Sequence, residues 1–237
     1  MENNTSLQQQ LLEAGVHFGH LKKKWNPKML PYIFAEKKGI HIIDLNKTLE
    51  GLQETAAAMK QIARSGKKIM FVGTKKQAKE IVTECAQRVN MPYVTERWLG
   101  GMLTNWNTVQ NRIERLKFLE QQELEGNFET LSKKDYSSQR KEIDKLRRLF
   151  NGIKEMSNLP DVVIFTSQLK DSLAIQECLR LGIPTICIVD TNCNPDLIPY
   201  PIPANDDSSS SINFILNYLV NRITTGYNII YKKTDSN

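Results

Sequence analysis

The chain has 237 residues, 40% of them hydrophobic, which is enough for one large core and excludes a chain that is disordered as a whole. No apolar run approaches the roughly 18 residues of a membrane helix, and the polar N-terminus lacks a secretion-signal pattern, so we expect a soluble, cytoplasmic protein. The net charge is +6, and residues 1–79 carry 14 Lys/Arg against 6 Asp/Glu, which indicates either a face that meets a polyanion or simply a basic surface.

The elements before residue 104 alternate between short apolar runs and helical spacing. Helices end at glycine or at Ser-Gly, and the strands are rich in β-branched residues. In chain order we expect a helix at 7–14, a loop, a β-hairpin formed by 32–34 and 40–43, a helix at 46–64, a strand at 68–72, a helix at 75–89 and a strand at 93–94.

The same alternation returns near the C-terminus. We expect a strand at 162–165, a helix at 170–181, a strand at 184–189, a helix at 212–223, and a disordered tail from about residue 228. Continuous apolar strands that alternate with helices predict a parallel sheet covered on both faces. The fold class is therefore α/β, with a doubly wound parallel sheet.

A charged segment at 104–156 interrupts this alternation. Two helical stretches, 104–125 and 133–156, each carry a thin apolar stripe and are separated by Gly126-Asn127 and a polar turn. A stripe this narrow buries only one face, so we expect an antiparallel helical hairpin inserted into the fold. The expected domains are an α/β body at 1–103 and 157–227, the inserted hairpin at 104–156, and a tail at 228–237.

A basic loop after the first helix is the strongest local signal. It holds His17, His20, a run of three lysines, and Trp25-Asn26. Lysines neutralise phosphates, and an aromatic ring can stack on a base, so this composition is typical of RNA contact. A metal site at the two histidines has little support, because no cysteine or carboxylate cluster lies nearby in the sequence. Alternatively, the aromatic residues only pack on the sheet.

Three other segments are candidates for RNA contact. The expected hairpin has a basic tip at Lys37-Lys38, and Lys75-Lys76 follows the strand at 68–72 where a helix N-terminus would attract an anion. That sequence is not a Walker A loop, and a solvated helix start would look the same. The run RWLGGMLTNW at 97–106 joins the sheet to the hairpin, and its paired glycines and two tryptophans favour a packed joint over an RNA contact.

Four aspartates gather at the expected carboxyl ends of the late strands, at Asp190, Asp196, Asp206 and Asp207. Open α/β sheets usually place active sites there, and a carboxylate pair can hold Mg²⁺ or exchange protons. No nucleophile is patterned beside them, and Asp206-Asp207 before four serines is also typical of a helix N-cap. We favour the cap.

Seven blocks of the sequence resemble the bacterial-type small-subunit ribosomal protein S2 family, in order from about residue 8 to 226. These blocks are AGVHFGH at 14–20, WNPKM at 25–29, GIHIIDL at 39–45, FVGTK at 71–75, RWLGGMLTNW at 97–106, DTN at 190–192 and NDD at 205–207. The resemblance implies a Rossmann-like sheet with a coiled-coil insertion and no catalysis. It also implies binding to 16S-type rRNA at the head–body junction on the solvent side, near the mRNA exit path. A further implied role is to help place the large mRNA-binding ribosomal protein number one.

Two departures from the family pattern affect the carboxyl edge of the sheet. Ser208 to Ser211 stand where the family usually has a basic residue after Asn-Asp-Asp, and Thr166 to Lys170 stand where an acidic residue and then His or Glu are frequent. We therefore expect this chain to lack the basic contact that the family makes near residue 210.

We predict a structural rRNA-binding protein of the small ribosomal subunit, with no cofactor and no metal. The expected location is the small ribosomal subunit in a bacterial cytoplasm, with a plastid as the alternative. The four cysteines, Cys85, Cys178, Cys187 and Cys193, are expected to be reduced thiols. The alternatives are a Mg²⁺-dependent enzyme of the doubly wound class and an adaptor that binds proteins through the hairpin. Predicted RNA contacts are Lys22, Lys23, Lys24, Trp25, Asn26, Lys28, Lys37, Lys38, Lys75, Lys76, Arg97, Asn105 and Arg112, with His17 and His20 shaping the surface.

Overall fold

The centre of the protein is a five-stranded parallel sheet, seen in a computed structural model that describes residues 2–126, 128 and 132–234. The strand order is β5-β4-β6-β7-β8. Strand β5 is added on one side of β4 and the later strands are added on the other side, starting with β6, which is the arrangement of a doubly wound sheet. The predicted doubly wound α/β fold is confirmed, and it is Rossmann-like. The strands are β4 (Ile69–Val72), β5 (Tyr93–Val94), β6 (Val162–Phe165), β7 (Thr185–Val189) and β8 (Tyr200–Pro203).

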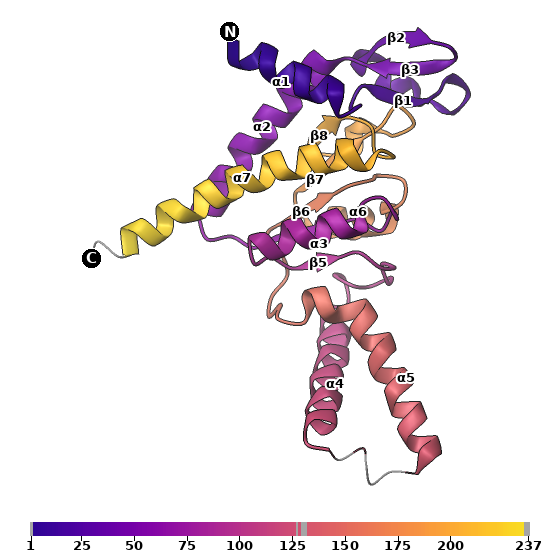
Figure 1. Cartoon of the computed structure of the whole chain (residues 1–237), viewed down its shortest axis with the longest axis vertical. Coiled ribbons are helices and arrows are strands. Elements are labelled where there is room, and N and C mark those ends of the chain that lie inside the picture. Colours follow the sequence, from indigo (N-terminus) through magenta and orange to yellow (C-terminus); the bar gives the residue numbers. More distant parts are fainter. Residues whose placement is uncertain (1, 127, 129–131, 235–237) are drawn as a thin grey trace.

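Helices cover both faces of this sheet because successive strand side chains point to opposite sides. Ile69 and Phe71 face one hydrophobic cluster, whereas Met70 and Val72 face the other. The first cluster packs against α2 (Leu45–Arg64), α3 (Lys79–Arg88) and α7 (Ser209–Thr234). The second packs against α6 (Ser172–Leu181) and the inserted helices. Figure 1 shows α2, α3 and α7 running along the sheet.

A second, antiparallel sheet of three strands precedes α2. Its order is β1-β3-β2, with β1 (Phe18–Leu21), β2 (Ile33–Lys37) and β3 (Ile40–Ile43). The predicted hairpin is confirmed, and its two turn residues, Lys38 and Gly39, both have positive φ, at 53° and 76°. Such a turn suits the right-handed twist of the strands. The loop predicted before it was wrong in part, because it contains β1 and two 3-10 helices, η1 (Lys22–Lys24) and η2 (Pro27–Tyr32).

The insertion consists of two helices, α4 (Trp106–Leu124) and α5 (Lys133–Phe150), that extend away from the sheet (Figure 1). Their predicted apolar stripes are buried, and ion pairs connect the helices in antiparallel register, for example Arg115 to Glu142 at 3.1 Å. A short 3-10 helix, η4 (Asn151–Ile153), follows α5. The predicted polar turn lies largely at 127 and 129–131, outside the described residues.

Several predicted boundaries were wrong. The first helix, α1, begins at Glu2 rather than at residue 7 and ends at Glu13. The C-terminal helix α7 continues to Thr234, so residues 228–234 are helical rather than irregular, and residues 235–237 lie outside the described chain. Strand β8 was not predicted, because Pro201 and Pro203 disfavour a central strand but are tolerated at the edge that β8 occupies. Within the described residues, no helix combines the length and the apolar character needed to span a membrane.

Candidate nucleic-acid interface

The three-stranded sheet is fixed to the carboxyl edge of the main sheet through Thr191. The Thr191 hydroxyl accepts a hydrogen bond from the backbone N–H of His20 at 2.8 Å, and the Thr191 carbonyl accepts one from the N–H of Asn26, also at 2.8 Å. Gly19 permits this contact, because its backbone lies directly against the Thr191 side chain. The segment that carries the lysine run is therefore held on the body at both of its ends.

Substitution of Gly19 by alanine is expected to weaken this attachment. The added Cβ would lie 2.5 Å from Cγ2 of Thr191 and 2.9 Å from the carbonyl oxygen of His41, so the backbone must move. We expect a loss of about 1–3 kcal/mol in the free energy of unfolding, measured in urea, and faster hydrogen exchange at the amides of His20 and Asn26. Gly100→Ala is the matched control, because its Cβ would make only an ordinary 3.7 Å contact with Leu173. Equal stability of the two variants would contradict the predicted clash.

The lysine loop and the β2–β3 turn form one exposed basic surface. The backbone N–H of Lys22 donates to the carbonyl of Gly39 at 2.9 Å, which brings the two segments together. The side chains of this basic arm are all exposed, and they belong to Lys22, Lys23, Lys24, Lys28, Lys37 and Lys38. Lys22 pairs with Glu36 and Lys28 with Asp196, both at 2.6 Å. Exposed pairs of this kind contribute little, so a phosphate can replace the carboxylate.

Trp25 and Asn26 have structural roles within the same loop. The Trp25 ring is half-buried and lies 5.2 Å from the His41 ring, between centroids. The Asn26 side chain accepts a hydrogen bond from the N–H of Lys28 at 3.0 Å and so caps η2. These contacts set the shape of the loop, and they leave only part of each side chain accessible.

Lys75 does not stand at a helix start, because α3 begins four residues later than predicted, at Lys79. Its ammonium lies 2.7 Å from Asp206 and 2.9 Å from Asp207, and the side chain is only 18% exposed. Burial acts to lower the pKa of Lys75, but Asp206 and Asp207 raise it on balance. Lys75 is therefore an internal counter-charge, whereas Lys76 is exposed.

His20 completes a partly buried ionic cluster with the carboxylates near Lys75. Its Nδ1 lies 3.0 Å from Asp190, and its Nε2 lies 3.2 Å from Asp207. The hydrogen bond with Asp190 raises the pKa of His20, and burial together with the Asp190 charge raises the pKa of Asp206. The expected N-cap role of Asp206-Asp207 was wrong. Helix α7 begins at Ser209, and the Ser208 hydroxyl accepts a 3.5 Å hydrogen bond from the N–H of Ser211. Asn205 forms the turn before the helix, where it accepts hydrogen bonds from the N–H groups of residues 207 and 208 at 2.8 and 3.2 Å.

This cluster also presents a possible set of metal ligands, which the local sequence did not reveal. Single donor atoms of His20, Asp190 and Asp206 all lie within 4.8 Å of one another. Imidazole and carboxylate donors together suit a divalent transition metal. In the structure, however, Lys75 and His20 already supply positive charge to these carboxylates.

Side chains of the two segments that depart from the family pattern, 166–170 and 208–211, form hydrogen bonds at the carboxyl edge of the sheet. The Ser211 hydroxyl donates to the carbonyl of Asn205 at 2.8 Å, which helps to begin α7. Gln168 exchanges two hydrogen bonds with the backbone of Asn194, at 2.5 and 2.6 Å. The Ser211 and Gln168 side chains therefore stabilise the edge, while Lys170 at the end of the second segment is exposed.

The joint between the sheet and the hairpin is organised by Glu177, which the sequence did not single out. This carboxylate is 3% exposed and accepts a 3.0 Å hydrogen bond from the Trp98 indole N–H. It also accepts hydrogen bonds from the N–H groups of Gly101, Leu103 and Thr104 and from the Thr104 hydroxyl, at 2.9–3.1 Å. Burial alone would raise its pKa, but these donors lower it. The expected packed joint is confirmed, with a buried acid at its centre.

The remaining predicted contacts belong to this joint and to α4. Arg97, Asn105 and Arg112 are exposed, and the Asn105 side chain accepts a 2.9 Å hydrogen bond from the Thr108 hydroxyl. Figure 1 places α4 and the three-stranded sheet at opposite ends of the molecule. The structure therefore does not gather all predicted contacts in one patch.

Comparison with known proteins gives a consistent family assignment. The model of the family described as ribosomal protein S2 matches residues 11–226. The chain is 52% identical over 217 residues to small ribosomal subunit protein uS2c of Porphyra purpurea, covering 92% of this chain and 90% of that protein. It is 51% identical to uS2c of Gracilaria tenuistipitata var. liui, with coverages of 92% and 94%. It is 49% identical to uS2 of Amoebophilus asiaticus, with coverages of 94% and 71%.

Proposed function

Because this chain belongs to the ribosomal protein S2 family, we propose that it is a structural constituent of the small ribosomal subunit that supports translation by binding ribosomal RNA. The family is a non-enzymatic component of the ribosome, so the acidic cluster at the sheet edge is structural and not an active site. The enzyme alternative can draw on the donor atoms of His20, Asp190 and Asp206, but His20 and Lys75 already neutralise these carboxylates.

The observation that carries the proposal is the basic arm on the three-stranded sheet. Its lysines are exposed, lie on adjacent segments, and are held on a rigid body through Thr191. A preorganised cluster of cations binds the phosphate backbone without a large ordering cost. We do not propose Lys75 as a direct RNA contact. It pairs with Asp206 and Asp207, and these pairs hold the two carboxylates beside His20. The proposed contacts outside the arm are Lys76, Arg97, Asn105 and Arg112.

We further propose the location of this interaction. The arm binds 16S-type rRNA at the junction of head and body on the solvent side, and the protein helps to place the large mRNA-binding ribosomal protein number one. The inserted helices pair as a coiled coil. Two of the relatives carry the name uS2c, which favours a plastid ribosome over a bacterial cytoplasmic one.

Replacement of Lys22, Lys23 and Lys24 by alanine tests the proposed surface. Each phosphate contact that is lost lowers the slope of log affinity against log salt by about 0.7–0.9, so we expect a decrease of up to roughly three contacts' worth. The measurement is a titration of small-subunit rRNA with purified protein at several salt concentrations. The control variant removes three exposed cations elsewhere, Arg64, Lys67 and Arg180.

Two results would contradict the proposal at different levels. A slope equal to that of the control variant would remove the lysine loop from the interface. Sedimentation of the endogenous protein entirely apart from small-subunit particles in low salt would remove the ribosomal assignment itself.

A further inference from the structure

Asp171 lies buried where the loops that follow β4 and β6 separate toward opposite faces of the sheet. The loop after β4 leads to α3, which packs against the first hydrophobic cluster, and the loop after β6 leads to α6, which packs against the second. The Asp171 side chain, directly before α6, is 1% exposed, and its Oδ1 accepts a 2.6 Å hydrogen bond from the Thr74 hydroxyl. This carboxyl group therefore connects the start of α6 to the loop at 73–78 between β4 and α3.

The Asp171 carboxyl group has fewer partners than a buried charge requires. Among the described residues, its Oδ2 has no hydrogen-bond partner, and the hydroxyl oxygen of Thr166 at the end of β6 has none either. Two cations act on Asp171: Lys170 is exposed, and the ammonium of Lys75 is already shared by two other carboxylates. Burial holds the pKa of the Cys187 thiol on β7 well above its ordinary value, so this group is neutral. An ionised Asp171 is therefore buried without a matched cation, which is costly.

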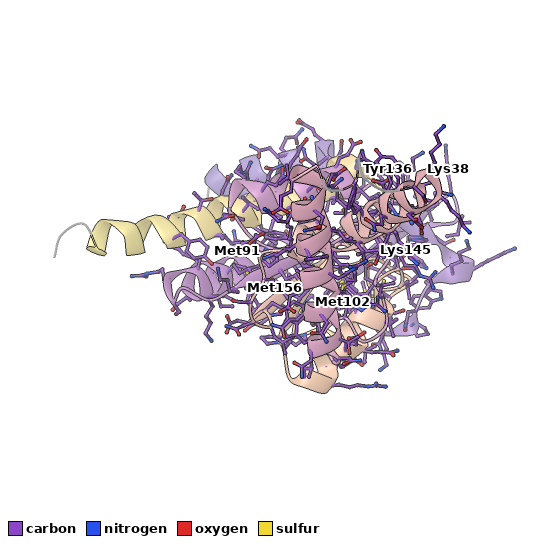
Figure 2. All side chains as sticks on the ribbon, turned by 90° about the horizontal axis from the view of Figure 1, so that it is seen from below. Lys38, Met91, Met102, Tyr136, Lys145 and Met156 are labelled. Atoms are coloured by element: carbon purple, nitrogen blue, oxygen red, sulfur yellow. The ribbon has the colours of Figure 1, made fainter. Side chains whose placement is uncertain are left out.

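Helix α6 cannot move aside to expose this carboxyl group without losing its packing. Its buried apolar side chains belong to the second hydrophobic cluster, together with Met102 from the joint. Figure 2 shows Met102 near the middle of the molecule, whereas Lys38 projects at its edge. The loop at 73–78 is less enclosed, because Lys76 and Gln77 are exposed. Water therefore reaches Asp171 most easily by an opening of this loop.

We propose that Asp171 and Thr74 form a proton-operated latch, which holds the loop at 73–78 against the start of α6 most firmly when Asp171 is neutral. The inference goes beyond RNA binding and does not rest on it. In the neutral state no charge is buried, and the Thr74 hydroxyl can still donate to the carboxyl group. In the ionised state the carboxylate gains free energy from hydration, so openings of the loop that admit water become more frequent.

The direction of the pH dependence follows from the burial of Asp171. Burial raises the pKa of this carboxyl group from 3.8 to about 6, although the hydrogen bonds from Thr74 act to lower it. The closed, folded protein therefore binds this proton more tightly than the open loop or the unfolded chain does. The resulting stabilisation is complete below pH 3.8 and is lost as the pH rises through about 6.

The test is a carbon-13 NMR titration of the Asp171 carboxyl group in the full chain, together with hydrogen exchange at the amides of residues 74–78. We expect a titration midpoint at about pH 6, and Thr74→Val should raise this midpoint, because the lost hydroxyl favours the charged form. With a pKa of about 6 when the loop is closed and 3.8 when it is open, protection of the loop amides should fall by up to about tenfold between pH 5 and 8, after correction for intrinsic exchange.

Asp171→Asn removes the titrating group and keeps its shape, so protection of the same amides should not change between pH 5 and 8. Asp144→Asn, an exposed change on α5, is the matched control and should keep the wild-type dependence. A midpoint at the ordinary value of 3.8 in the wild-type protein would overturn the latch, whether or not the variants fold. Wild-type pH dependence in Asp171→Asn would overturn it as well, because another group would then be responsible.

Discussion

Glu177→Ala is expected to lower the free energy of unfolding by about 3–5 kcal/mol, measured in urea at neutral pH. The substitution removes the acceptor for the Trp98 indole N–H and for the backbone N–H groups of Gly101, Leu103 and Thr104. Each buried donor that is left without a partner costs about 1–3 kcal/mol, and relaxation of the joint recovers part of the sum.

The pH dependence of this loss has a definite sign. The folded-state pKa of Glu177 lies below its ordinary value of 4.5, so its carboxylate contributes stability above about pH 4.5. That contribution is lost as the pH falls through the folded-state pKa. The difference between wild type and Glu177→Ala should therefore narrow in acid. Glu114→Ala, an exposed change on the hairpin, is the control. Equal unfolding midpoints for the two variants would exclude the proposed role of Glu177.

Lys75→Met should also be strongly destabilising, by about 3–5 kcal/mol, although the residue lies in a motif that suggests an RNA contact. Lys75 neutralises Asp206, which is 2% exposed and close to a second buried carboxylate, that of Asp190. Removal of one partner of a buried pair leaves an uncompensated charge, which costs far more than loss of an exposed pair. Denaturant unfolding of the purified protein measures the effect.

The second substitution Asp206→Asn identifies the cause of this loss. When the buried carboxylate is neutral, the methionine at position 75 faces no unpaired charge, so the double variant should recover most of the lost stability. Lys76→Met is the matched control, because its side chain is exposed. Additive losses in the double variant, or equal effects of Lys75→Met and Lys76→Met, would show that Lys75 is not the counter-charge of Asp206.

Local sequence was sufficient to predict the elements whose apolar pattern matches the faces that are buried in the structure. The strands at 69–72, 162–165 and 185–189 are continuous apolar runs, because parallel strands are covered on both faces. The hairpin helices were predicted from thin apolar stripes, since one side of each helix is buried and the other remains in water. The lysine loop was singled out for its basic composition, and its lysines are exposed, because a charged amine without a partner is costly to bury.

The sequence by itself thus determined the α/β alternation, the inserted helices and the basic composition of the lysine loop and the hairpin tip, each of which depends on residues that are neighbours in the chain. The joining of the loop and the tip into one basic arm came from the fold, through the hydrogen bond from Lys22 to Gly39. Only the tertiary structure decided that Lys75 pairs with Asp206, that His20 lies beside Asp190, and that Glu177 binds the Trp98 indole at the joint between the sheet and the hairpin. Their partners lie in distant segments, and a buried charge adopts whatever position brings it an opposite charge or enough hydrogen-bond donors. The local sequence pattern does not identify these partners, because the packing of distant segments against one another determines which groups meet.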